Sequence, residues 1–216
     1  MEITAKELEN MIDFEKVKDR VIYKLVRKDE KIVKEVPYVK YLDMLIVFYI
    51  KLNEKEYALV SNELAKQFKA DTDDLMLAAM QNTPRILGAS VRGIFDVINY
   101  YLMKAGSPFL FEGLDNIDVP LMVLTNNINT YGASTMLYTD LMKGIANRLN
   151  TDLYIIPCTI HELILAPVDE SQDVNSMIEL ISNVNDTELA KEDILSYSLY
   201  QYKRETNEIT IVEKGN

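Results

Sequence analysis

Apolar residues in the first half of the chain recur mainly at steps of three and four, which is the spacing of one helical face. This pattern predicts amphipathic helices over Phe14–Lys28 and Arg85–Lys104. The stretch Tyr41–Leu52 is aromatic and β-branched in its middle, so a buried strand and a helix both fit it, and we favour a helix or a mixed element. Residues 1–105 are therefore predicted to form a helix-rich half.

Shorter elements between these stretches follow from capping and turn residues. Tyr57–Val60 is a candidate for a short strand, and Ser61 is placed to cap a short helix after it. The acidic run Asp71–Asp74 is typical of a helix start, because carboxylates there accept from free N–H groups and complement the helix dipole. Asn82–Pro84 should end that helix or start the next, because a proline disfavours helical backbone at the residue before it.

The second half contains short apolar stretches separated by turn residues, which is typical of strands. Two alternating runs flank a turn at Thr206-Asn207 and predict a C-terminal hairpin. The other predicted elements are strands at Pro120–Thr125, Leu153–Pro157 and His161–Ala166, and helices at Ser134–Leu149 and Asn175–Val184. Hairpins among these strands imply an α+β fold, with a mostly antiparallel sheet, packed amphipathic helices and a more helical N-terminal half.

The turn-rich stretch Gly106–Val119 is the best candidate for a boundary inside the chain. It would separate a helix-rich half, residues 1–105, from an α+β half, residues 106–216, that ends in the hairpin. One continuous domain also fits a length of 216 residues.

The formal net charge of the chain is −11, and this charge is unevenly distributed. Residues 1–56 hold 12 basic and 12 acidic residues, whereas residues 57–216 hold 11 basic and 22 acidic ones. An acidic surface repels phosphate backbones, so direct nucleic-acid binding is disfavoured and a protein partner with a basic surface is favoured.

Cysteine and histidine are each present once, as Cys158 and His161. A single cysteine excludes an internal disulfide and a cysteine-based zinc site, and it fits a reducing compartment. The start of the chain lacks the features of a signal peptide, and the longest apolar run, Met44–Ile50, is far too short to span a bilayer. We therefore predict a cytoplasmic protein without a membrane segment, and no motif predicts a cofactor or a metal site.

The segment Cys158–Glu162 brings a thiol, an imidazole and a carboxylate together in the sequence. A thiolate paired with His161 and oriented by Glu162 would suit acyl transfer. In a single strand, however, Cys158 and Glu162 share one face while His161 points to the other. A buried structural cysteine and a histidine bonded at a strand end are the favoured interpretation.

A polar loop, Asn126–Ser134, leads into a predicted helix. Backbone N–H groups at a helix start can bind an anion, which makes Asn126, Asn129 and Ser134 candidate binding residues. The loop lacks the Lys and the second Gly of a P-loop, so an ordinary strand-to-helix connection capped by Ser134 or Thr130 is favoured.

Several segments in this order resemble an uncharacterised bacterial family, known as a domain of unknown function and common in anaerobic Gram-positive bacteria. They are Phe14–Leu25, Val36–Tyr38 with Tyr41–Phe48, Asp74–Met76 with Ala78–Pro84, Val123–Asn126, Gly132–Ser134, Leu153–Pro157 with Ile160–Glu162, and Leu195–Tyr200. The resemblance implies no activity, cofactor or catalytic residue.

Two departures from this family matter for function. Its members commonly carry a further segment ahead of the part that matches Phe14, which this chain lacks, and they commonly have Ser-Ser at Cys158-Thr159. If serine is accepted at position 158, the thiol is not a required nucleophile.

The leading hypothesis is therefore a soluble, acidic, non-enzymatic interaction protein, including an acidic inhibitor or nucleic-acid mimic that acts on a basic protein. The alternative is a hydrolase that uses Cys158, His161 and Glu162, and a third hypothesis is anion binding by the loop Asn126–Ser134.

Overall fold

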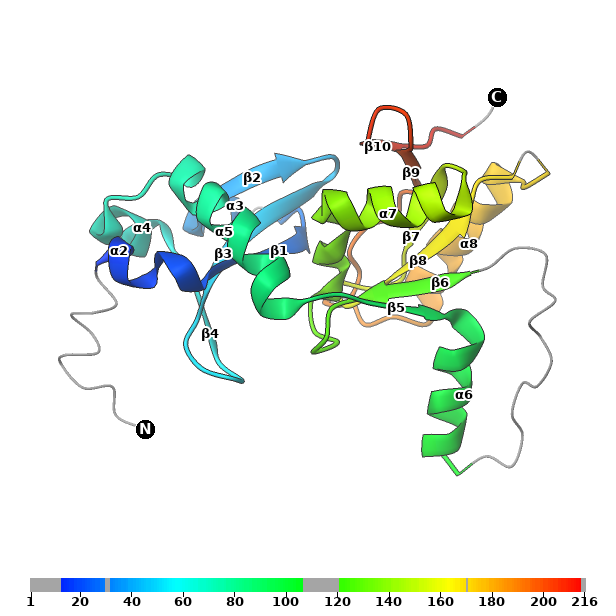
Figure 1. Cartoon of the computed structure of the whole chain (residues 1–216), viewed down its shortest axis with the longest axis horizontal. Helices are drawn as coiled ribbons and strands as arrows, with labels where there is room; N and C mark the ends of the chain where they lie inside the picture. The colour runs from blue at the N-terminus through cyan, green and yellow to red at the C-terminus, as the bar shows by residue number, and fades with distance from the viewer. Residues whose placement is uncertain (1–12, 30–31, 107–120, 170, 215–216) are drawn as a thin grey trace. The chain divides into compact units, whose positions relative to one another are not determined.

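The computed structural model describes residues 13–29, 32–106, 121–169 and 171–214. The chain divides into two compact units, Met1–Gly88 and Ala89–Asn216. Each unit has its own antiparallel sheet with helices beside it (Figure 1), which confirms the predicted α+β fold. Most of the stretch predicted to hold the boundary, residues 107–119, lies outside the described residues.

Unit 1 is built around the long strand β3, which pairs with β1 on one side and with both β2 and β4 on the other. In chain order its elements are α2 (Phe14–Val17), η1 (Lys18–Arg20), β1 (Val21–Arg27), α3 (Ile32–Glu35), β2 (Tyr38–Tyr41), β3 (Met44–Lys51), β4 (Tyr57–Leu59), α4 (Asn62–Phe68) and α5 (Thr72–Leu87). The long helix α5 packs on β1 and η1.

The helix predicted over Phe14–Lys28 is wrong beyond Arg20, because Val21–Arg27 forms β1. The first five residues of β1 are all buried, so no period-two alternation marks it as a strand. The helical preference for Tyr41–Leu52 is wrong for the same reason, since β3 is almost continuously buried.

The capping predictions in unit 1 are confirmed. Ser61 Oγ accepts from the backbone N–H of Leu64 at the start of α4. Asp71 accepts from the N–H groups of Asp73 and Asp74, and the Asp74 carboxylate accepts from the N–H of Asp71, which completes a capping box.

Pro84 does not end the helix as predicted but lies inside α5. Two side chains just before it bind the backbone of β1 and η1. Asn82 Nδ2 donates to the carbonyls of Lys18 (2.7 Å) and Val21 (3.1 Å), and Thr83 Oγ1 accepts from the N–H of Tyr23 (3.0 Å). These bonds hold α5 against β1 in the helical turn that contains Pro84. Tertiary contacts therefore outweigh the tendency of a proline to end a helix.

Unit 2 contains a sheet with the strand order β10-β9-β7-β8-β6-β5, in which every neighbouring pair is antiparallel. Its elements are β5 (Ser90–Gly93), α6 (Ile94–Lys104), β6 (Met122–Thr125), η3 (Gly132–Leu137), α7 (Thr139–Leu149), β7 (Leu153–Pro157), β8 (Leu163–Pro167), α8 (Val174–Thr187), β9 (Tyr200–Lys203) and β10 (Glu208–Ile211). The predicted C-terminal hairpin is confirmed as β9 and β10.

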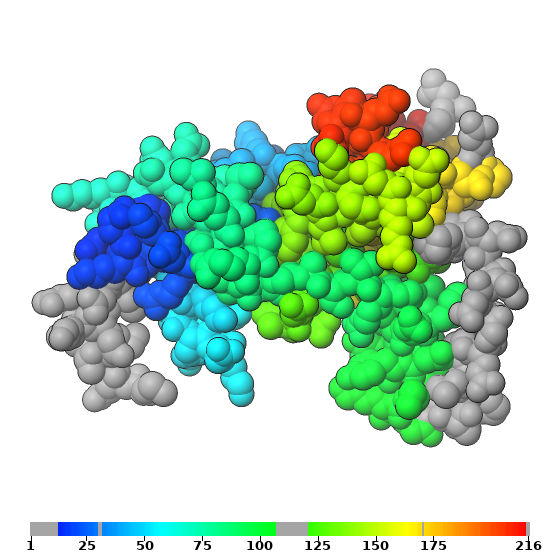
Figure 2. All heavy atoms as spheres, in the orientation of Figure 1, coloured from blue at the N-terminus to red at the C-terminus, as the bar shows by residue number. Residues whose placement is uncertain are grey.

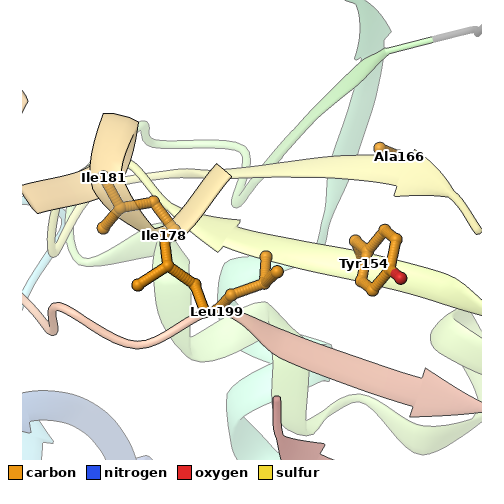
Figure 3. Packing of buried hydrophobic residues seen from close by; sticks show 5 residues of the cluster. All are labelled: Tyr154, Ala166, Ile178, Ile181 and Leu199. Atoms are coloured by element: carbon orange, nitrogen blue, oxygen red, sulfur yellow. The ribbon is translucent and has the colours of Figure 1, made fainter. Parts of the chain in front are cut away.

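Helix α8 covers one face of this sheet. Ile178 and Ile181 of α8 pack with Leu199, Tyr154 of β7 and Ala166 of β8, all of which are buried (Figure 3). Because side chains alternate along a strand, the neighbouring residues of β7 are directed to the opposite face of the sheet. The outer side of α8 is left facing solvent.

Two of the helices predicted from the sequence are interrupted in the structure. The pattern over Arg85–Lys104 covers the end of α5, the strand β5 and the helix α6. The pattern over Ser134–Leu149 covers part of η3 and then α7, and Tyr138 separates the two.

Among the described residues, no helix combines the length and apolar character that crossing a membrane requires.

Candidate functional site

Three connections of unit 2 meet at the end of β6. Thr125 Oγ1 donates to the carbonyl of His161 (2.8 Å), which lies in the turn between β7 and β8. In that turn, the carbonyl of Ile160 accepts from the N–H of Ala133 (3.3 Å), and the N–H of Ile160 donates to the carbonyl of Asp193 (2.9 Å). Hydrogen bonds therefore join three segments that are distant in sequence: the end of β6 with the loop after it, the turn that contains His161, and the segment around Asp193.

Both ring nitrogens of His161 face a group of the protein. Nδ1 accepts from the backbone N–H of Tyr131 (3.0 Å), so in the neutral ring the proton is on Nε2. Nε2 lies 3.5 Å from Asp193 Oδ1. Since the lone pair of Nδ1 is engaged and Nε2 carries the proton, the neutral ring links Tyr131 to Asp193 and has no lone pair directed at a substrate.

Cys158 is a free, half-buried thiol in the turn between β7 and β8. Burial, with a further contribution from the charge of Glu162, raises the pKa of Cys158 to about 12. His161 is instead held by Tyr131 and Asp193. Both the burial of the thiol and the charge of Glu162 therefore disfavour the thiolate that acyl transfer needs. The hydrolase hypothesis stays a prediction, and thiol reactivity tests it.

We expect Cys158 in the folded protein to react with iodoacetamide about 1,000-fold more slowly at pH 7.5 than an ordinary thiol, because the thiolate is the nucleophile and its fraction falls tenfold per unit of pKa. The rate should rise about tenfold per pH unit as the thiolate forms. Mass spectrometry of the alkylated chain measures it without ambiguity, since no other cysteine is present. The urea-unfolded chain is the control. Equal rates for both states at pH 7.5 would contradict the raised pKa, and a folded chain that reacts faster than the unfolded one would instead support the hydrolase.

The hydrogen-bonding groups of Asn126 are used inside its own loop. Its Nδ2 donates to the carbonyl of Thr130 (2.8 Å), and its Oδ1 accepts from the N–H groups of Ile128 (3.1 Å) and Thr130 (3.3 Å). Ser134 is buried within the short helix η3, and Asn129 is exposed in a left-handed conformation (φ 51°). Asn126 therefore acts as a clamp that shapes the loop, and anion binding by Asn126, Asn129 and Ser134 stays a prediction.

Among the residues that the structure describes, no three side chains of His, Cys, Asp or Glu are grouped as metal ligands would be. The partner of His161, Asp193, was not predicted from the sequence. It lies 32 residues further along the chain, and no motif relates the two positions.

A second candidate site is the outer side of α8. Leu180 and Val184 are one helical turn apart on the solvent side and are 62% and 37% exposed. Glu179 and Glu188 are exposed beside them. We call Glu179, Leu180, Val184 and Glu188 the α8 face.

Charge makes this face unusual within the chain. Residues 149–190 contain no Lys or Arg but hold eight Asp and Glu residues. Unit 2 as a whole has eight basic and 18 acidic residues, whereas unit 1 has 15 and 16. The acidity of the chain therefore belongs to unit 2. The missing basic residues were the signal in the sequence that could have identified the face.

Comparison of the chain with curated proteins and with solved structures finds no match. A family model described as "Family of unknown function (DUF5688)" matches residues 2–204. This match covers nearly the whole chain and confirms the resemblance to a domain of unknown function. The chain belongs to the DUF5688 family.

Proposed function

We propose that this protein is a binding protein whose α8 face docks on a basic protein surface. One observation carries the proposal: two exposed apolar side chains, Leu180 and Val184, lie in a region of 42 residues without a single Lys or Arg. Protein interfaces commonly combine an apolar centre with a polar rim, and complementary charge selects the partner.

The class of partner follows from the charge. Basic surfaces are typical of proteins that bind nucleic acids. An acidic protein seated on such a surface excludes the nucleic acid, so the activity we propose is inhibition of a nucleic-acid-binding protein. The setting we propose is the cytoplasm, which fits the unpaired Cys158.

The test is competition. The full chain is titrated into complexes of purified basic nucleic-acid-binding domains with a labelled duplex, and fluorescence anisotropy reports release of the duplex. We expect release with at least one domain, and a binding constant that falls linearly on a log–log plot as salt rises.

Variants of the α8 face separate its two contributions. Glu179→Lys with Glu188→Lys should weaken binding about tenfold or more and flatten the salt dependence, because both changes place like charge against the partner. Leu180→Ala should weaken binding without changing the salt dependence, because it removes apolar contact alone.

The matched control is Glu205→Lys with Glu208→Lys at the β9–β10 hairpin, which changes the net charge equally at exposed positions elsewhere in unit 2. If the control weakens binding as much as the α8 variants do, general acidity and not the α8 face is responsible. If no domain releases its duplex, the proposal is wrong.

A further inference from the structure

Helix α6 is far more apolar than its environment explains. Eight of its eleven residues are apolar or aromatic, but Val97 is its one fully buried residue. Tyr100, Tyr101 and Met103 are 52%, 57% and 65% exposed. A helix that is apolar on nearly all sides is normally buried on nearly all sides, so this exposure indicates a docking surface.

The helix extends away from the sheet of unit 2 (Figure 1), and its atoms form a projection in Figure 2. Its exposed side carries a simple charge pattern. Asp96, Tyr100 and Lys104 follow one another at steps of four, which places them along one ridge of the helix, and all three are exposed. Among the described residues, neither Asp96 nor Lys104 is part of an ion pair.

This ridge is complementary to itself. Asp96 lies four residues before Tyr100 and Lys104 four residues after it, about 6 Å to either side along the helix axis. When two such ridges meet antiparallel at Tyr100, each Asp96 faces the partner's Lys104. A two-fold axis generates each contact twice, so the attractive pair of Asp96 with Lys104 of the second copy occurs twice in the dimer.

We propose that α6 is a homodimerisation helix that packs antiparallel on the α6 of a second copy of this chain, with Tyr100 at the two-fold axis and Asp96 paired with the partner's Lys104. Tyr100 and Met103 supply the apolar centre of the contact. A single helix face is smaller than the roughly 800 Å² per partner of a stable complex, so the dimer is weak, with a dissociation constant in the range of about 1–100 µM.

Sedimentation velocity on the full chain in about 0.15 M salt, where charges more than about 8 Å apart are screened, tests this proposal. We expect the weight-average mass to rise from monomer towards dimer with concentration. Asp96→Lys alone and Lys104→Asp alone should each raise the dissociation constant about tenfold or more, because each places two like-charged pairs across the axis.

Recombining the charges distinguishes pairing from damage to the helix. The two single variants mixed in equal amounts should form a mixed dimer, since both of its pairs are again opposite in charge. The double variant Asp96→Lys/Lys104→Asp should also regain dimerisation, although both of its changes oppose the helix dipole. Regain therefore cannot come from repair of the helix.

The controls are Asp140→Lys and Lys143→Asp, which make the same charge changes at exposed positions of α7 and should leave the dissociation constant unchanged. A chain that stays monomeric at every concentration would overturn the proposal, and α6 would then be covered within one chain or by another protein. A dimer that the single variants do not weaken, or that recombination does not restore, would overturn it equally.

Discussion

Gly132→Ala is expected to lower the free energy of unfolding of the protein by about 3 kcal/mol or more. A Cβ atom at position 132 would lie 2.5 Å from the carbonyl oxygen of His161 and 2.7 Å from the backbone nitrogen of Asn126, and it would overlap Thr125 Oγ1. Two of these three atoms belong to the backbone, so no side-chain rotation relieves the contact.

The expected cost is large because Gly132 lies where the three connections of unit 2 meet. The hydrogen bond from Thr125 Oγ1 to the carbonyl of His161 closes directly over it. If a Cβ at position 132 pushed these atoms apart, the hydrogen bond from the Tyr131 N–H to Nδ1 of His161 would also be disturbed. The glycine is therefore required for close approach of backbone to backbone and not for a positive φ.

Gly144→Ala is the matched control. Gly144 lies in α7, and a Cβ built there has no heavy atom within 4 Å. Alanine is the better helix former by roughly 0.5–1 kcal/mol, so this variant should be neutral or more stable. Urea unfolding compares the two variants, and native-state hydrogen exchange should show the loss for Gly132→Ala in β6, η3 and β8. Equal stability of the two alanine variants would contradict this account of the site.

The parts of the fold that the sequence predicted correctly are those with a local cause. The capping residues Ser61 and Asp71 act within one helical turn, and the β9–β10 hairpin alternates across a short turn. The strands β1 and β3 were missed because both of their faces are buried, and a doubly buried strand shows no alternation.

The geometry of the candidate site was not predictable from strand alternation. Alternation would separate His161 from Cys158 only if Cys158–Glu162 formed one strand, but these residues form the turn between β7 and β8. In that turn burial, with a contribution from Glu162, raises the pKa of Cys158, while His161 contacts other groups. The partners of His161, Tyr131 and Asp193, are brought to it by the strand order of the sheet. Spacing along the chain contains no information on such contacts.

The sequence segment Ala78–Pro84, part of the family resemblance, has a structural explanation in unit 1. Asn82 is buried in α5, and its amide bridges two carbonyls, that of Lys18 in η1 and that of Val21 at the start of β1. Its Oδ1 accepts from the guanidinium of Arg85 (2.8 Å), which also donates to the carbonyl of Asp19. One side chain therefore satisfies the backbone at the point where η1 turns into β1.

Asn82→Ala should consequently lower the free energy of unfolding by about 1–3 kcal/mol, because the buried carbonyl of Val21 loses the Asn82 amide and an unsatisfied buried group costs about 1–3 kcal/mol. The carbonyl of Lys18 adds less, because its bond to Asn82 is only partly buried and it still accepts from the N–H of Val21. The better helix propensity of alanine offsets part of this loss, by about 0.5 kcal/mol. The neighbouring residue Gln81 is exposed on the same helix, so Gln81→Ala receives the helical gain without the loss and should stay within about 0.5 kcal/mol of the parent. Urea unfolding of the parent and both variants gives the comparison.

The loss of stability should be located in β1 and α5. Hydrogen exchange of the Tyr23 N–H measures it, because Thr83, next to Asn82, accepts a hydrogen bond from that group. A stable Asn82→Ala protein with slow exchange at Tyr23 would show that the β1–α5 contact rests on apolar packing alone, which the buried residues Val21, Leu75 and Ala79 would then have to supply.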